Sequence, residues 1–327
     1  MCWGLCSAAG GAGARLEVRA SSATADEHRR SAYIGVAAAI VGSIGFSGKP
    51  IVIKLAYMHG VDVMTLLALR MLFALPFFLA MALHAGRAPV PLTRRDWLNV
   101  LSLGFIGYYV GSYLDLAGLQ HISASLGRLI LYLYPTLVLL LSAVWLKQRV
   151  TRRHLVSLAL SYGGIVLVFR SEFSVTGPTH ETLIGAALVF SSAVTYAIYL
   201  IAGTRMIHKV GSMRFTAYAS IAATVFVLAT FLGTHDASQL LVPASVYGLT
   251  LVLAIFSTVL PLWLMAEGLK RIGANQVSLV ACIGPVATIG LAYTFLGEPV
   301  TPAQLAGAAL VLCGIVIISV KFRPTRG

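Results

Sequence analysis

The chain has 327 residues, of which 58% are hydrophobic and only 11% charged, and its formal net charge is +13. Soluble domains carry about 25% charged residues, so this composition and the mean hydropathy of +0.87 exclude an ordinary soluble enzyme and indicate a polytopic membrane protein. A nucleic-acid partner would require the basic residues to cluster on one soluble face, and the spans described below leave no such domain.

The first segment, residues 1–30, reads MCWGLCSAAGGAGARLEVRASSATADEHRR. It lacks the apolar core of a signal peptide, because glycine and charged residues interrupt it throughout. We therefore expect a disordered cytoplasmic tail, or an over-long start of the reading frame. Cys2 and Cys6 lie in this tail while Cys282 and Cys313 lie in later spans, so the four cysteines make no disulfide framework.

Beyond the tail, the chain consists of apolar runs of about 20 residues, long enough to cross a bilayer as helices. About ten are predicted: 33–55, 63–83, 97–117, 122–146, 155–170, 182–202, 214–233, 243–265, 276–296 and 304–321. The first five make up a unit over 31–170 and the last five a unit over 182–322. The predicted fold class is therefore an all-α polytopic membrane protein.

The two units are a repeat, since the stretch Leu119–Thr151 recurs without a gap as Leu269–Thr301, and a shift of 150 residues places Pro135 on Pro285. A repeat of this length indicates one unit used twice. Basic residues follow the apolar run in the first copy (LKQRVTRRH) but precede it in the second (LKRIG). Lys and Arg mark the cytoplasmic side, and a unit with an odd number of spans must alternate its orientation. We therefore predict two inverted five-helix repeats.

The distribution of positive charge predicts the orientation. With the amino terminus inside, most of the 24 Lys and Arg residues fall in cytoplasmic tails and loops. This bias places both termini in the cytoplasm. The charge thus reflects topology, and no nucleic-acid partner is expected.

Five charged residues lie within or beside apolar spans of the first unit. Lys49, Arg70 and Arg128 fall in the outer half, with Lys54 and Asp115 nearer the outer interface. A charge facing lipid at a helix centre would cost about 2.5–3.5 kcal/mol or more, so these residues should face protein or water. Two interpretations stay open: a structural one, in which the arginines cap bent helices or pair with Asp115 and Lys54 snorkels, and binding of an anionic group on a substrate.

Three prolines are predicted to break or bend helices, namely Pro50, Pro135 and Pro285. Pro285 should leave the carbonyl of Ala281 without its helical partner. Inverted-repeat carriers place substrates at broken helices near the midplane, although simple kinking is the alternative. Tyr109, Tyr132 and Trp263 join Lys49, Arg70 and Arg128 as candidate substrate-binding residues, with packing as their alternative role.

Motifs for catalysis are absent from the sequence, which contains no HExxH, GxSxG or Walker loop and no Cys/His set with metal-ligand spacing. We therefore predict no enzyme activity, no catalytic residue, no metal and no cofactor.

The series of helix start, apolar run, proline and polar turn in 122–151 and 272–301 resembles the drug/metabolite transporter superfamily, in particular proteins built from two EamA-type units. The resemblance covers nearly everything after residue 31. Glu298 matches the acidic residue common after the fourth helix of a unit, whereas Gln148 stands at that place in the first unit. The resemblance implies a ten-helix inner-membrane carrier for small organic solutes, often an exporter of amino acids, metabolites or drugs.

The predicted function is therefore a secondary transporter, an exporter of small organic metabolites such as amino acids or organic acids, working by alternating access. Its partners are a small-molecule substrate and the lipid bilayer, and a homodimer is left open. The alternative is a membrane receptor or scaffold that binds a ligand without moving it.

Overall fold

The computed structural model describes residues 8–85, 91–145, 147, 151–176, 180–281 and 283–319. The first unit contains α1 (Ala8–Tyr57), α2 (Val63–Ala85), α3 (Arg94–Leu103), the π-helical η1 (Gly104–Val110), α4 (Gly111–Leu119), α5 (Ala124–Leu131), α6 (Tyr134–Trp145) and α7 (Arg152–Thr176). The second contains α8 (His180–Val210), α9 (Ser212–Thr234), η2 (Ala237–Leu240), α10 (Ala244–Ala254), the π-helical η3 (Ile255–Val259), α11 (Leu260–Ala281), α12 (Ile283–Leu296) and α13 (Pro302–Ser319).

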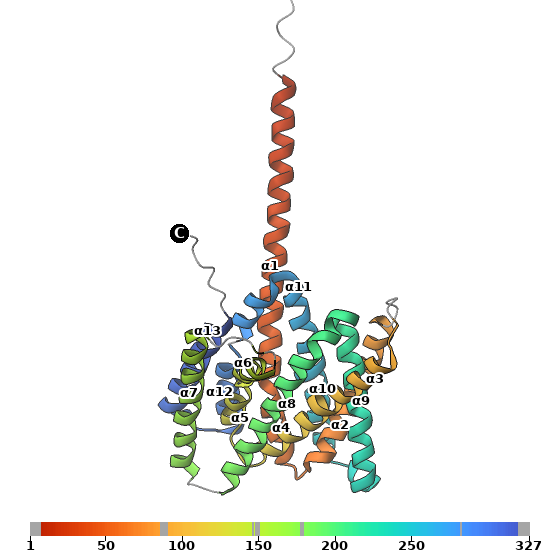
Figure 1. The fold of residues 1–327 in the computed structure, drawn as a ribbon, viewed down its shortest axis with the longest axis vertical. Coiled ribbons are helices and arrows are strands. Elements are labelled where there is room, and N and C mark those ends of the chain that lie inside the picture. The colour runs from red at the N-terminus through yellow and green to blue at the C-terminus, as the bar shows by residue number, and fades with distance from the viewer. Residues whose placement is uncertain are drawn as a thin grey trace, which may run out of the picture.

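These elements form an all-helical bundle that matches the predicted spans (Figure 1). Among the described residues, eight helical segments are long and apolar enough to cross a membrane, and Ile283–Leu296 and Pro302–Ile317 are shorter apolar helices. α1 enters and α13 ends at the same end of the bundle (Figure 1), here called the proximal end. The opposite end is called the distal end.

The inverted relation of the units is visible where equivalent helices meet. α7 and α13 pack side by side with Ser157 opposite Gly314 and Ser171 opposite Thr301, so they run antiparallel. Their backbones approach closely, since a methyl group added to Gly164 would lie 2.5 Å from the carbonyl oxygen of Gly307. Small residues permit this approach between helices in a membrane. The predicted inversion of the two units is thus confirmed.

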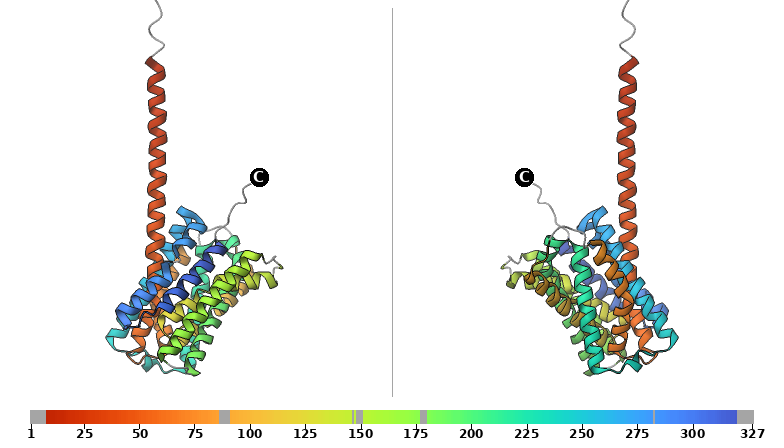
Figure 2. Two further views of the ribbon diagram at one scale, coloured as in Figure 1. Left: turned by 90° about the vertical axis from the view of Figure 1, so that its left-hand side faces the viewer. Right: turned by 90° about the vertical axis from the view of Figure 1, so that its right-hand side faces the viewer.

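A second contact between the units occurs twice, once from each unit to the other. A methyl group on Gly35 of α1 would lie 2.8 Å from Ile272 of α11, and one on Gly185 of α8 would lie 2.8 Å from Ile122. The shift of 150 residues relates both members of these pairs. Figure 2 shows α1 and α11 side by side, although they belong to different units. Each unit therefore packs its first helix against the other unit.

The units differ in where their fourth span begins. In the first unit, α4 ends at Leu119 and Ser123 caps a new helix, its hydroxyl accepting from the backbone N–H of Leu126 at 3.2 Å. The equivalent residue in the second unit is Gly273, which has no side chain to serve as a cap. There α11 continues to Ala281, so the predicted span 276–296 is divided, its first six residues belonging to α11 and Ile283–Leu296 to α12.

Two further expectations differ from the structure. Pro50 lies inside α1, which continues through it as a helix, and Thr288 of α12 donates to the carbonyl of Ser47 in the turn before it. Upstream, the backbone of α1 is helical from Ala8, where the sequence predicted a disordered tail; alanine, a strong helix former, recurs there. Residues 1–7 lie outside the described part of the chain.

Candidate functional site

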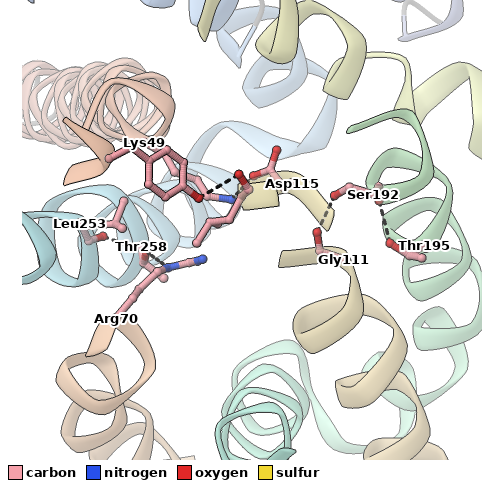
Figure 3. Close-up of polar contacts among 10 residues, drawn as sticks. Lys49, Arg70, Gly111, Asp115, Ser192, Thr195, Leu253 and Thr258 are labelled. Atoms are coloured by element: carbon pink, nitrogen blue, oxygen red, sulfur yellow. Dashed lines mark hydrogen bonds and ion pairs between the residues drawn. The ribbon is translucent and has the colours of Figure 1, made fainter. Parts of the chain in front are cut away.

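A buried ion pair lies at the centre of the first unit. Lys49 of α1 donates to Asp115 of α4, with Nζ and Oδ2 at 2.6 Å, and the two side chains are only 15% and 7% exposed. Figure 3 shows Lys49, Asp115 and Arg70 converging from three helices. Asp115 therefore pairs with a lysine, whereas the structural interpretation of the sequence paired it with an arginine.

Arg70 lies on α2 beside this pair and is only 6% exposed. Its Nε donates to the hydroxyl of Thr258 in η3 at 3.3 Å, while its Nη1 is buried without a hydrogen-bond partner in the described part of the chain. A buried guanidinium needs its donors satisfied. Arg70 is thus a cation whose hydrogen bonds are incomplete.

Arg128 of α5 is likewise a buried cation with incomplete hydrogen bonding. It is 8% exposed, its guanidinium carbon lies 4.8 Å from the ring centroid of Tyr132, and its Nε is buried without a partner among the residues described. Arg70 and Arg128 both interact electrostatically with Lys49. Among the described residues, the cluster consequently contains three cations and one close carboxylate, that of Asp115.

The two π-helical turns are equivalent in the repeat and flank Arg70. η1 and η3 coincide under the shift of 150 residues, which places Tyr108 on Thr258. Thr258 accepts the hydrogen bond from Arg70, and Tyr108 interacts with Arg70 electrostatically. π-Helical turns are rare and frequently occur at functional sites. Hydropathy carries no signature of them, so sequence reasoning missed Thr258 and Tyr108.

The predicted helix break in the first unit faces the break in the second. α5 ends at Leu131 and α6 begins at Tyr134, just before Pro135, while α12 begins at Ile283, just before Pro285. The carbonyl of Ala281, which the sequence predicted to lose its helical partner, accepts from the hydroxyl of Tyr132 at 2.9 Å and from Ser43 at 3.3 Å. Tyr132 thereby connects Arg128 to the other unit.

Tyrosine rings line the second-unit side of Arg128. Tyr134 and Tyr196 lie edge to face at 5.1 Å between ring centroids, and Tyr196 stacks on Tyr199 at 6.1 Å. Tyr196 is close enough to Arg128 for an electrostatic interaction yet keeps 36% of its surface accessible. Aromatic side chains of α6 and α8 therefore lie beside Arg128.

Two of the candidate substrate-binding residues, Tyr109 and Trp263, lie away from this cluster, and so does Lys54. Tyr109 contacts α9, its hydroxyl 3.0 Å from that of Thr230. Trp263 on α11 is 58% exposed. Lys54 lines a separate hollow of about 260 Å³ at the distal end, together with Glu298. Among the described residues, no group of His, Cys, Asp or Glu side chains could hold a metal ion.

An inverted-repeat helix bundle with charged residues at the centre of its spans is the architecture of a membrane carrier. The comparisons agree with this class. The model of the EamA-like transporter family matches residues 33–170 and 183–320. The chain belongs to that family.

Relatives and solved structures extend the comparison. The uncharacterized transporter YcbK of Bacillus subtilis is 30% identical, over 91% of this chain and 96% of its own. The probable terminal-alkyne amino-acid exporter of Streptantibioticus cattleyicolor is 28% identical, over 73% of this chain and 79% of its own. A solved structure titled "Crystal structure of protein" superposes with a TM-score of 0.60 at 19% identity, covering 88% of this chain and 95% of that one, and shows the fold alone.

Proposed function

We propose that this transporter exports small organic solutes with an anionic group, such as amino acids or organic acids, across the inner membrane by alternating access. The observation that carries the proposal is the excess of buried positive charge. Lys49 uses the carboxylate of Asp115, while Arg70 and Arg128 each keep a buried nitrogen without a partner in the described structure. An uncompensated ion in a low-dielectric bundle costs several kcal/mol, so a substrate carboxylate would stabilise the site.

Two further observations support it. A guanidinium can hold a carboxylate in a two-pronged pair, and Tyr196 lies close enough to Arg128 for an electrostatic interaction, which places a phenol beside the bound anion. One relative is named as a probable exporter of an amino acid, a compound with a carboxylate. The site residues of this proposal are Arg70 and Arg128, with Lys49 and Tyr132 beside them.

The direct test is a counterflow screen with the purified protein in proteoliposomes. We expect labelled amino acids or organic acids to accumulate against their unlabelled counterparts, and cations without an acidic group to be ignored. Preference for such cations would contradict the anionic substrate. Saturable binding without counterflow would identify a receptor or scaffold instead.

The inverted topology predicts opposite accessibility for two equivalent positions. Arg152 begins α7 and Thr301 precedes α13, and the repeat relates them, but these helices run antiparallel. Single cysteines at Arg152 and Thr301 should react with an impermeant thiol reagent from the cytoplasmic and the external side, respectively. Reaction of Thr301→Cys from the cytoplasm would contradict the orientation that the basic loops indicate.

Restoring the missing backbone donors at the two breaks should slow transport. Pro135→Ala and Pro285→Ala would each supply an N–H that can extend the following helix toward the preceding one, and carriers rearrange at such interruptions. We expect transport rates to fall several-fold with membrane insertion unchanged. Pro76→Ala is the matched control, because Pro76 lies inside α2 away from both breaks. Wild-type transport rates for both variants would show that Pro135 and Pro285 only kink their helices.

A further inference from the structure

The distal end holds a contact in which one unit caps a helix of the other. Glu298 follows α12 in the second unit, and its Oε1 accepts from the backbone N–H of Ala124 at 2.7 Å. Its Oε2 accepts from the N–H of Ser125 at 3.2 Å and from the hydroxyl of Ser125 at 2.9 Å. All three donors belong to the first turn of α5 in the first unit.

These bonds complete the hydrogen bonding of that helix end. The first N–H groups of a helix have no intrahelical acceptor and must find one elsewhere. Here Glu298 takes those of Ala124 and Ser125, Ser123 takes that of Leu126, and Gly127 begins the helical series by donating to the carbonyl of Ser123. A carboxylate also suits the positive end of the helix dipole. Ser123 alone cannot satisfy this turn.

The capped helix is the one that carries Arg128. α5 has only eight residues, and Ser125 and Arg128 lie three positions apart, so the capped turn and the substrate-facing residue move as one short rigid element. Just below the cap, Ala124, Ile51 and Ala292 form a buried cluster that joins α5, α1 and α12. Any passage from the Arg128 site to the distal side between α5 and α12 must separate these groups.

The water-accessible side of the cap is the distal hollow already noted. Its wall includes Glu298, Lys54, His121, Ser123, Ser171 and Gln304. The hollow therefore places polar groups directly beyond the cap, on the route by which a solute would leave. Ser171 and Thr301 add a second polar contact between the units at this end, with hydroxyl oxygens 2.8 Å apart.

We propose that Glu298 is the positioning residue that holds the distal exit closed: by capping α5 from the other unit, it keeps the helix that carries Arg128 against α12. Opening to the distal side then requires the first turn of α5 to leave the carboxylate. This inference rests on the proposed alternating access. It explains why the carboxylate lies on the loop of one unit and its donors on the helix of the other.

The test uses a reporter cysteine at Ala292, which is fully buried in the cluster beneath the cap. The chain's own four cysteines are replaced by serine, and membrane vesicles are treated from the distal side with an impermeant maleimide. Glu298→Gln keeps the size of the side chain but removes the charge and one acceptor. Because a hydrogen bond to a charged group is among the stronger ones, we expect Ala292→Cys to react about tenfold faster in this variant.

Two controls separate an exit role from a general loss of stability. Glu181→Gln makes the same chemical change at another distal acid, whose side chain is 77% exposed and 3.9 Å from His121; its labelling rate should equal that of the parent. A second reporter, Ala223→Cys, lies fully buried on α9, and its rate should not change in Glu298→Gln. Faster labelling at both reporters would show that Glu298 supports the fold rather than the exit, and would overturn the proposal.

If Glu298→Gln does not insert into the membrane, a milder variant, Ser125→Ala, still tests the proposal. Ser125→Ala removes only the hydroxyl bond and should raise the labelling rate of Ala292→Cys by a smaller factor. Unchanged labelling in Ser125→Ala, or in an inserted Glu298→Gln, would overturn the role of Glu298. Counterflow in the same vesicles is scored separately, since a wild-type protein without counterflow contradicts the transport proposal but leaves the effect of Glu298 on labelling measurable.

Discussion

Replacing Arg128 with glutamine is expected to lower transport of an anionic solute about 10- to 100-fold, because hydrogen bonds to charged groups contribute about 1.5–3 kcal/mol and a two-pronged pair would be lost. Stability should move the other way or not at all. Arg128 is buried with a nitrogen that lacks a partner in the described structure, so the substitution removes a charge that is costly to bury. Transport in proteoliposomes and thermal unfolding in detergent measure the two effects.

The matched comparison is Lys54→Gln, which removes a cation from the wall of the distal hollow rather than from the central cluster. We expect a mild effect on transport there. Arg128→Lys should restore little, since an ammonium cannot form the planar two-pronged pair. A loss of stability in Arg128→Gln with transport unchanged per folded molecule would show that the arginine is structural.

Replacing Asp115 with asparagine is expected to cause the largest loss of stability of any substitution considered. The change removes the carboxylate that pairs with Lys49. The buried cations Lys49, Arg70 and Arg128 then lie near one another without that negative charge. Breaking a buried ion pair by removing one partner destabilises a protein by about 3–5 kcal/mol. The midpoint of thermal unfolding in detergent should fall accordingly.

The double variant Lys49→Gln with Asp115→Asn gives the counter-test. It removes one cation together with the acid, so it should recover most of the stability lost in Asp115→Asn. Asp62→Asn is the control at the distal surface. Asp62 accepts from the N–H groups of Met64 and Thr65 at the start of α2, a role that asparagine also fills. Its 3.3 Å contact with His235 lies at an exposed surface, where ion pairs contribute little, so the effect of the substitution should be small. Equal losses for Asp115→Asn and the double variant would exclude charge as the cause.

Much of the fold could be predicted from the sequence, because apolar length and the repeat are local or periodic signals. The ten apolar spans and the inversion followed from hydropathy, the shift of 150 residues and the reversed basic flanks. The stranded carbonyl of Ala281 followed from the covalent structure of Pro285 alone, and the structure shows the groups that satisfy it. Such predictions depend on neighbours in the chain and need no knowledge of packing.

The site could be predicted only in part. A charged residue within an apolar span stands out in the sequence because it is costly to expose to lipid. The sequence therefore singled out Lys49, Arg70, Arg128 and Asp115. Which cation pairs with the carboxylate of Asp115 depends on how closely α1 and α4 approach each other, and the sequence does not report that distance. Lys54 and Lys49 look alike in the sequence, yet Lys49 reaches Asp115 while Lys54 lines the distal hollow. The cap by Glu298 joins residues 173 and 174 positions apart, and its counterpart Gln148 lies outside the described residues.

The exchange of first helices between the units has a consequence for biogenesis. α1 is synthesised before α11, yet the surface that Gly35 and Gly42 present packs on α11. Because a close-packed glycine surface gains little from lipid alone, this face of α1 reaches its final packing only after α11 has been inserted. A chain that stops after α7 should therefore insert with this glycine surface of α1 unpacked.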